Sequence, residues 1–451
     1  MIDRFIWNNY SVNAFLLFIT LIAVNAMWVY LFVLALKSHF HTPVIRSGRP
    51  LSTSINLRIK KKKLDLTNTN LYFDTTDNQS LPFVSVIIPA RNEGNYIQRC
   101  LLSLLCQNYA NFEVIVVDDN STDNTLRILK NMEKKPEEKN RLKIVSLTDK
   151  PNSWTGKTWA SEQGYLQSRG DVLLFTDADS FYFSKDTISL AISFMCKENL
   201  DVLTGVPHLE LSDFWSKIAV PLWFLFTEVF RSGIADVNNP KSNVAYVMGS
   251  FFIIKRGIFE ELGTFRAVCN EIQEDRTIGI NIKKAGYKMK IVKIDELVSA
   301  QLSRDLTTLW HYIRRHLTAV AMESKWQPLI NFLTLTFMTV LPFMILPYIM
   351  IIAAQNSKFL SLPQHSIYTP ESLPLSLLLF LNILCCSMII LGVAMKDIKK
   401  HRLTPIYSLL AFPGGLFLTI AYLANIVPLL KPSKPRLVTW KGRRYPNIRK
   451  D

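Results

Sequence analysis

Four long stretches of the sequence contain no Asp, Glu, Lys or Arg. Each is long enough to cross a hydrocarbon core about 30 Å thick at about 1.5 Å per helical residue. A purely water-soluble protein is therefore excluded, and we expect an integral membrane protein. The uncharged stretches are Val12–Leu36, Pro328–Gln355, Leu373–Met395 and Leu403–Leu430.

The first stretch also lacks the small-residue cleavage pattern of a secretory signal peptide. Its uncharged run is longer than the roughly 7 to 15 apolar residues of a signal-peptide core. We therefore expect it to be a retained membrane anchor rather than a cleaved leader.

Cysteine is scarce, and its spacing is uninformative. The chain has six cysteines, none of them in a Cys-x-x-Cys pair or at metal-ligand spacing. We expect reduced, unpaired thiols, which fits a cytosolic soluble domain.

Acidic residues are absent between Lys37 and Lys63, where eight Lys or Arg follow the first uncharged stretch. The positive-inside tendency places this segment, and the soluble domain after it, in the cytoplasm. Anionic lipid head groups explain the net charge of +16 better than a nucleic-acid partner does, because no nucleic-acid-binding motif accompanies the charge.

The last uncharged stretch makes the topology ambiguous. Three spans after a cytoplasmic domain would place the C-terminal tail outside, yet the tail from Lys431 holds eight Lys or Arg against one Asp. The Pro and Gly residues in Ala411–Gly415 are able to break the helix into a re-entrant or in-plane element. We favour a cytoplasmic tail.

These features divide the chain into five parts. We expect an N-terminal transmembrane anchor, a basic linker, a soluble catalytic domain, a membrane region of about three segments and a basic tail. Their expected bounds are 1–36, 37–81, 82–326, 327–430 and 431–451.

The soluble domain alternates between strand and helix patterns. VSVIIPA, EVIVVDD and LKIVSL are apolar, β-branched runs, and segments with helical spacing separate them. This alternation predicts an α/β fold with a parallel sheet covered on both faces, in which ligands bind beyond the carboxyl ends of the strands.

Asp213–Phe230 is either an interfacial helix roofing a lipid groove or an ordinary core helix.

Acids follow three of the predicted strands. A single acid at a strand end is usually a turn former or a helix cap, but several that converge would repel one another unless a cation sits among them. Mg²⁺ or Mn²⁺ suits carboxylate oxygens and leaves sites for phosphate oxygens. The acids are Glu93, Asp118, Asp119, Asp177 and Asp179.

The combination of VSVIIPARNEG, VVDDNSTDNT, TDADS and EIQEDRTIGI resembles the family 2 inverting glycosyltransferases with the GT-A fold, over residues 82 to about 316. The resemblance implies that a nucleoside pocket is lined by Pro89, Ala90, Glu93 and Asp119. It further implies that Asp177 and Asp179 form the Asp-x-Asp pair, with Asp179 the direct metal ligand. Glu274 and Asp275 match the acidic element near the acceptor, where Asp275 would be the catalytic base.

A second resemblance concerns WTGKTWASEQG, which is similar to an element of membrane enzymes that glycosylate lipids, including carotenoid-type and hopanoid-associated ones. It places Lys157 near a donor phosphate, whereas the alternative is a solvated loop lysine. QLSRD lacks the Trp of the Gln-x-x-Arg-Trp element found in polysaccharide synthases, although Arg304 is retained as a diphosphate ligand. A transferase of single sugars is therefore favoured over a processive synthase.

We accordingly expect a membrane-bound enzyme that moves a sugar from a nucleotide-sugar donor to a hydroxyl of a lipid or lipid-linked acceptor. In one displacement, a metal and a cationic side chain neutralise the leaving diphosphate while a carboxylate deprotonates the acceptor. A polysaccharide synthase and a polyprenyl-phosphate glycosyltransferase are the alternatives within enzymes, and a non-catalytic membrane scaffold is the alternative outside them.

Overall fold

The computed structural model describes two compact units, which are treated separately below. Unit 1 comprises Met1–His41, Leu211–Gly233 and Leu302–Asp451, and unit 2 comprises Thr42–Glu210 and Ile234–Gln301. The described residues are 19–33, 42–46, 81–134, 141–230, 234–271, 273–323, 326–355, 372–396, 402–429, 437–440 and 443–446.

The division differs from the bounds expected from the sequence. Residues 211–233 and 302–326 were expected in the soluble domain, but they group with the apolar helices of unit 1. Most of the basic linker, and most of the tail apart from the strands β11 (Leu437–Trp440) and β12 (Arg443–Pro446), lies outside the described residues.

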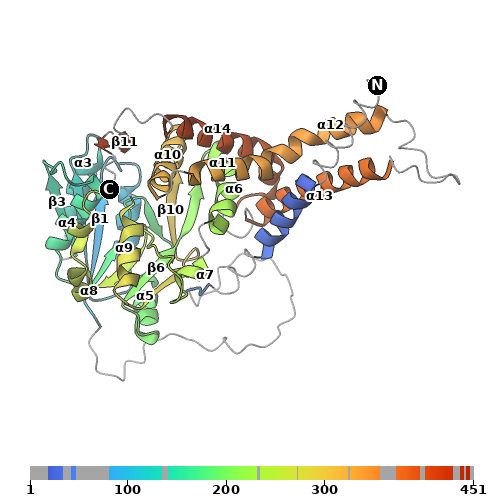
Figure 1. Ribbon diagram of the computed structural model, residues 1–451. Coiled ribbons are helices and arrows are strands. Elements are labelled where there is room, and N and C mark those ends of the chain that lie inside the picture. Colours follow the sequence, from blue (N-terminus) through green and yellow to red (C-terminus); the bar gives the residue numbers. More distant parts are fainter. Residues whose placement is uncertain are drawn as a thin grey trace. The chain divides into compact units, whose positions relative to one another are not determined.

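Unit 2 is built on a seven-stranded sheet with the order β3-β2-β1-β4-β8-β6-β9 (Figure 1). The first four strands run parallel, β8 is antiparallel to both of its neighbours, and β6 pairs parallel with β9. A smaller sheet joins β5 (Ser180–Tyr182), β10 (Val298–Ser303) and β7 (His208–Leu211). The large sheet contains β1 (Val84–Ala90), β2 (Phe112–Asp119), β3 (Leu142–Leu147), β4 (Val172–Phe175), β6 (Val202–Val206), β8 (Phe252–Lys255) and β9 (Met289–Lys293).

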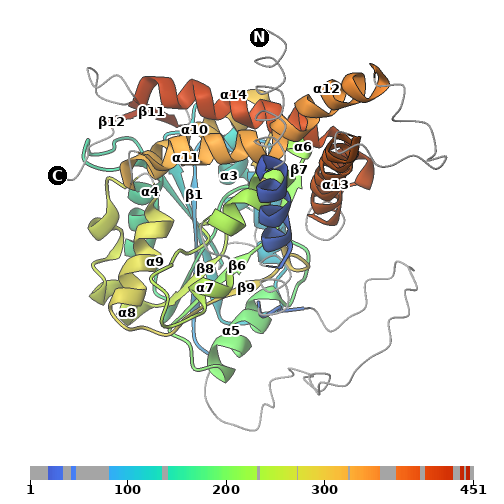
Figure 2. The same ribbon diagram turned by 45° about the vertical axis from the view of Figure 1, so that its right-hand side comes forward.

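Helices cover both faces of this sheet (Figures 1 and 2). α2 (Ile97–Leu105), α3 (Thr125–Glu133) and α5 (Thr187–Lys197) share one apolar core with alternate strand residues such as Val86 and Ile88. The opposite face packs against α4 (Gly156–Leu166), α8 (Arg256–Glu261) and α9 (Glu274–Lys284), through residues such as Ile87. Continuous apolar strands are buried on both faces in this way, so the predicted α/β class is confirmed.

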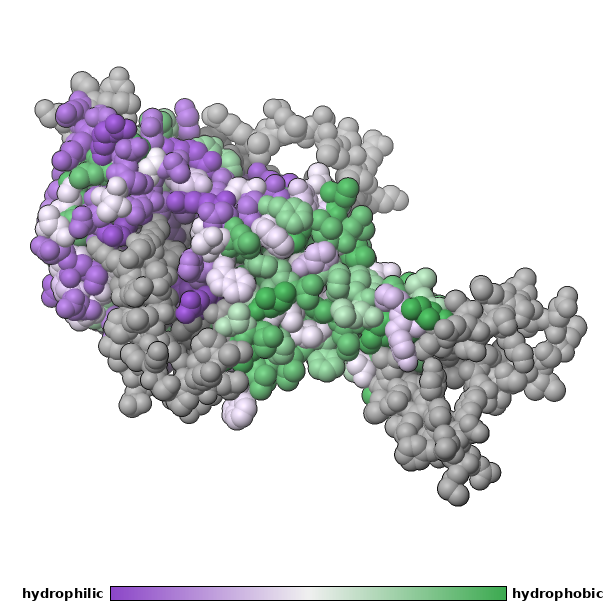
Figure 3. Space-filling view, turned by 90° about the horizontal axis from the view of Figure 1, so that it is seen from above, coloured by the Kyte–Doolittle hydropathy of each residue, from purple (hydrophilic) through white to green (hydrophobic). Residues whose placement is uncertain are grey.

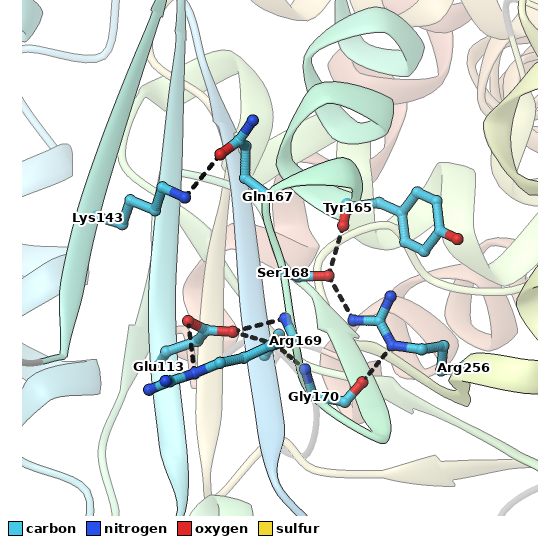
Figure 4. A network of polar contacts seen from close by, with 9 residues as sticks. Glu113, Lys143, Tyr165, Gln167, Ser168, Arg169, Gly170 and Arg256 are labelled. Carbon is cyan, nitrogen blue, oxygen red and sulfur yellow. Dashed lines mark hydrogen bonds and ion pairs between the residues drawn. The ribbon is translucent and has the colours of Figure 1, made fainter.

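A polar network fixes the amino ends of the parallel strands (Figure 4). Glu113, at the start of β2, accepts hydrogen bonds from Ser85 Oγ at 2.6 Å and from Arg169 N at 2.9 Å. Gly170 N donates to Ser85 Oγ at 2.8 Å, and Arg256 Nε donates to the Gly170 carbonyl at 2.6 Å. These bonds join β1, β2 and the segment before β4 at the amino ends of the strands.

Unit 1 contains the apolar helices, and Figure 3 shows apolar residues gathered over them. Three helices are each long and apolar enough to cross a membrane, namely Gln327–Ile351, Leu377–Met395 and Pro405–Ala424, among the described residues. The last two lie within predicted stretches, and the first begins one residue before the predicted stretch Pro328–Gln355. The described part of the first stretch forms the shorter helix Ile19–Val33. The remaining helices of unit 1 are α6 (Phe214–Phe230) and α10 (Leu306–Glu323).

Two expectations about unit 1 can be compared with the structure. In α6, the residues from Ile218 to Val220 are buried, whereas Phe214 and Trp215 are exposed, so the core helix and the interfacial helix both stay predictions. The Pro and Gly residues in Ala411–Gly415 are helical and lie, directly after the 3-10 helix Pro405–Leu410, at the start of α14 (Ala411–Leu429). Pro413 lies in its first turn, where a missing N–H costs no hydrogen bond.

Gly414 has a packing role instead, and its substitution provides a test. A Cβ at Gly414 would lie 2.2 Å from the backbone carbonyl oxygen of Ile218 in α6. Gly414→Ala is therefore expected to lower the free energy of unfolding by about 1 to 3 kcal/mol, as overpacking does. Thermal unfolding of the detergent-solubilised protein measures this. Gly257→Ala is the control, since its Cβ would meet nothing within 4 Å, and equal melting temperatures for the two variants would refute the packing role.

Candidate active site

The carboxyl ends of β1, β2 and β4 lie at one edge of the large sheet, because these strands are parallel neighbours. Ala90 pairs in register with Asp118, so the two loops that follow leave the sheet side by side. Glu93, Asp118 and Asp119 are all buried there, with exposed fractions of 3%, 1% and 3%. The predicted convergence of acids from the first two strands is therefore present.

Hydrogen bonds join the loop after β1 to the loop after β2. Glu93 N donates to Thr125 Oγ1 at 2.8 Å, and Thr122 N donates to Asn92 Oδ1 at 2.8 Å. Asn92 and Asn120 both have a φ of 54°, the left-handed region that asparagine tolerates better than most residues. Pro89 and Ala90 lead directly into this paired turn, which the sequence shows only as two separate polar segments.

Lys157 lies between carboxylates from two different elements. Its Nζ atom is 2.8 Å from Asp177 Oδ1, just after β4, and 3.2 Å from Glu274 Oε1, in the first turn of α9. Burial alone would lower the pKa of the ammonium, but the charges of Asp177, Glu274 and Asp275 outweigh it and raise the pKa above the ordinary lysine value. The lysine therefore stays protonated, and the alternative of a solvated loop lysine is wrong.

Local backbone contacts fix the start of α4, and with it Lys157. Thr155 caps the helix by accepting a hydrogen bond from Thr158 N at 3.3 Å. Thr155 N and Thr158 Oγ1 both donate to the Cys269 carbonyl at 2.7 Å. Because Cys269 lies shortly before α9, these bonds hold the lysine helix against the segment that leads to Glu274.

A buried carboxylate fixes the same segment further along α4. Glu162, whose side chain is 2% exposed, accepts from Arg266 Nε at 3.0 Å and from Phe265 N at 3.1 Å. Both partners belong to the short helix η1 (Thr264–Val268). A buried carboxylate held by two donors tolerates little movement, so α4 and η1 keep their relative positions.

Glu274 and Asp275 occupy the first turn of α9, as predicted, where the helix dipole favours negative charge. Val247 N donates to the Asp275 carbonyl at 3.1 Å, and Asp275 Oδ1 accepts from Arg276 N at 2.8 Å. A small pocket adjoins the two acids. Its apolar walls include Phe175, Phe252 and Phe265, and the low polarity of such walls strengthens the charge interactions beside them.

Asp179 lies in the turn between β4 and β5, and its charge acts on the buried thiol of Cys100. Burial raises the pKa of Cys100, and the charges of Asp179 and Asp177 raise it further. Cys100 Sγ donates to the Asp177 carbonyl at 3.8 Å. Within the described ranges, no group of three or more His, Cys, Asp or Glu side chains is arranged to hold a metal ion. The roles of Asp177 and Asp179 as metal ligands stay predictions.

The sequence missed two features of this edge. Gly249 was not singled out, although a Cβ there would lie 2.6 Å from Lys157 Nζ. The ion pair between Glu162 and Arg266 was also missed, because no sequence pattern links a residue of α4 to a residue of η1 so far along the chain. Arg304, expected beside the diphosphate, belongs to unit 1. All other predicted site residues lie in unit 2.

Part of the chain is similar in sequence to known glycosyltransferases. YdaM of Bacillus subtilis, a probable glycosyltransferase, is 28% identical over 215 residues, which are 47% of this chain and 49% of that protein. The 4,4'-diaponeurosporenoate glycosyltransferase of Staphylococcus haemolyticus is 36% identical over 103 residues, 23% of this chain and 26% of that protein. The beta-monoglucosyldiacylglycerol synthase of a Nostoc species is 27% identical over 168 residues, 35% of this chain and 34% of that protein.

The matched regions thus span about half or less of the length of these relatives. The family described as glycosyl transferase family 2 matches residues 85–263, which begin at the first strand of the large sheet and include both Asp177 and Asp179. Residues 85–263 form a glycosyl transferase family 2 domain.

Proposed function

We propose that this protein is a membrane-bound inverting glycosyltransferase that moves a sugar from a nucleotide-diphosphate donor to a hydroxyl of a lipid or lipid-linked acceptor. The observation that carries the proposal is the ion cluster of Lys157 with Asp177 and Glu274. It lies at the carboxyl ends of the strands of a family 2 domain, where α/β sheets bind their ligands.

The donor side is assigned to the ends of β1, β2 and β4. Pro89, Ala90, Glu93 and Asp119 would line the nucleoside pocket, because they lead into the paired turn between the first two strands. The ammonium of Lys157 would contact a phosphate of the donor. Arg304 remains a proposed diphosphate ligand on the resemblance alone.

The donor set fits a divalent cation. Asp179 would hold Mg²⁺ or Mn²⁺ with help from Asp177, and phosphate oxygens would complete the coordination, as hard oxygen ligands do for these ions. Lys157 Nζ lies 2.8 Å from Asp177 Oδ1, so this carboxylate already pairs with one positive charge and a divalent cation would have to share it. When bound, the cation would offset the charge that develops on the leaving diphosphate.

The acceptor side is assigned to the start of α9. Asp275 would take the proton of the acceptor hydroxyl, while Glu274 stays paired with Lys157. A single displacement with this base inverts the anomeric carbon, and it needs no enzyme nucleophile. Glu274 would thus keep the Lys157 ammonium close to the neighbouring base, Asp275.

A lipid acceptor is favoured for two reasons. The described part of unit 1 contains three helices apolar enough to cross a membrane, so the catalytic unit would work at a membrane surface. The names of two relatives also include an apolar part, diaponeurosporenoate in one and diacylglycerol in the other. The basic residues after Leu36 favour a cytoplasmic position for the catalytic unit.

A thermal-shift screen tests the donor class. Detergent-solubilised full-length protein is heated with Mn²⁺ and UDP-, GDP- or dTDP-sugars. One nucleotide type should raise the unfolding temperature, because a ligand at about 100 times its Kd stabilises the folded state by about 2.7 kcal/mol. The free sugar is the control and should cause no shift. The absence of any shift with every nucleotide sugar would refute the proposed donor class.

Product analysis with the selected donor then distinguishes the acceptors. Incubation with extracted membrane lipids should yield a lipid that carries one sugar. A polymer would indicate a polysaccharide synthase instead, and a product labile to mild acid would indicate a polyprenyl-phosphate acceptor.

A further inference from the structure

The position that a cation would take beside Asp177 is already held by a side chain. Lys157 Nζ lies 2.8 Å from Asp177 Oδ1 and 3.2 Å from Glu274 Oε1. The Glu274 side chain is only 11% exposed, whereas that of Asp177 is 34% exposed. The ammonium is therefore shared between a carboxylate that is closed to solvent and one that is open to it.

The protein is built to hold the lysine in this place. Gly249 faces the ammonium without a side chain, and a Cβ there would lie 2.6 Å from Nζ. The start of α4 is tied to the Cys269 carbonyl by two hydrogen bonds of 2.7 Å, so the lysine and the segment before Glu274 do not shift independently. A flexible surface lysine would have none of these constraints.

A divalent cation at Asp177 would have to share this carboxylate with the ammonium. Two positive charges within a few ångströms repel strongly in surroundings of low polarity. A nucleoside diphosphate removes this conflict, because its phosphates supply the negative charge that a second cation needs. The ammonium is able to turn toward those phosphates, since its four-carbon stem is flexible.

We infer that Lys157 acts as the resident cation of the site and couples cation binding to donor arrival. In the free protein the Lys157 ammonium is paired with the Asp177 carboxylate, and its positive charge disfavours the binding of a divalent ion to that carboxylate. When the donor binds, the ammonium shifts from Asp177 to the diphosphate, and Asp177 becomes available to the divalent ion. Glu274 keeps the lysine in reach throughout. The identity of the donor in this inference rests on the proposed function. The pairing of Lys157 with Asp177 does not rest on it.

Measurement of Mn²⁺ binding tests the inference without any assay of transfer. The electron paramagnetic resonance signal of free Mn²⁺ is titrated with full-length protein in detergent, first alone and then with the nucleoside diphosphate selected by the thermal-shift screen. Wild type should bind Mn²⁺ weakly alone, and about ten- to a hundredfold more tightly with the nucleotide. Lys157→Met should bind Mn²⁺ alone about ten- to a hundredfold more tightly than wild type does, and the nucleotide should increase its Mn²⁺ affinity by a smaller factor than in wild type.

Two further variants keep the test decisive. Gly249→Ala retains the lysine but displaces its ammonium, so Mn²⁺ alone should again bind more tightly than to wild type even if Lys157→Met does not fold. Lys255→Met is the matched control, because Lys255 Nζ lies 2.9 Å from Asp201 Oδ1 in an ion pair of the same kind. Its Mn²⁺ affinity should equal that of wild type.

The outcomes separate this inference from the proposed function. Equal Mn²⁺ affinity of wild type, Lys157→Met and Gly249→Ala without nucleotide would overturn the inference, whether or not nucleotides bind. If the two variants bind Mn²⁺ more tightly than wild type does, the pairing of Lys157 with Asp177 is supported. If in addition none of the proteins binds a nucleotide, the proposed donor class is overturned.

Discussion

Asp275→Asn is expected to lower the rate of sugar transfer by about 10²- to 10⁴-fold, the range lost when a general base is removed. Asparagine keeps the size of the side chain and an oxygen that accepts from Arg276 N, the bond that spans 2.8 Å in the wild type. The backbone bond from Val247 N to the carbonyl of residue 275 is also unaffected. The fold and the donor site should therefore survive while the base is lost.

Two measurements on the same preparation check this prediction. The initial rate of transfer to lipid should fall, whereas the thermal shift caused by the donor with Mn²⁺ should match that of wild type. Asp186→Asn is the matched control, since Asp186 is the acid at the N-cap of α5 and lies at the start of a helix in the same unit. Wild-type transfer by Asp275→Asn would exclude Asp275 as the base.

The central strands and the positions of the acids could be predicted from the sequence because they depend on local patterns. The runs VSVIIPA and LKIVSL became β1 and β3 with the expected bounds, and EVIVVDD became β2 with one more residue. Apolar β-branched residues are buried on both faces of a parallel sheet, which leaves little choice of structure. The strand ends, and with them Asp119 and Asp177, followed directly.

The contacts that organise the site could not be predicted, because they join residues far apart in the chain. The sequence shows Lys157 and Glu274 in separate motifs, and only the packing of α4 against the segment before α9 brings them together. Gly249 is inconspicuous until the ammonium beside it is known. Local patterns also leave the place of α6 open, because its apolar residues suit the soluble core and the helices of unit 1 equally well, and the structure groups it with unit 1.

Asp179→Ala is expected to reduce transfer by a comparable factor, but through a different loss. A cation that offsets charge on a leaving group contributes several kcal/mol to the transition state, which corresponds to about 10²- to 10⁴-fold in rate. Asp179 is the proposed ligand of that cation, so its removal should weaken the binding of Mn²⁺ and donor together. Asp275→Asn, by contrast, leaves this binding intact.

The dependence of the transfer rate on Mn²⁺ concentration distinguishes the two variants. In Asp179→Ala the residual rate should rise with Mn²⁺ well beyond the concentration that saturates wild type, and the thermal shift by the donor should be lost. The melting temperature without ligand should stay close to that of wild type, because Asp179 lies in the turn between β4 and β5 and its charge raises the pKa of the buried Cys100 thiol. An unchanged donor shift in Asp179→Ala would contradict its role as metal ligand and leave Asp177 as the remaining carboxylate for the cation.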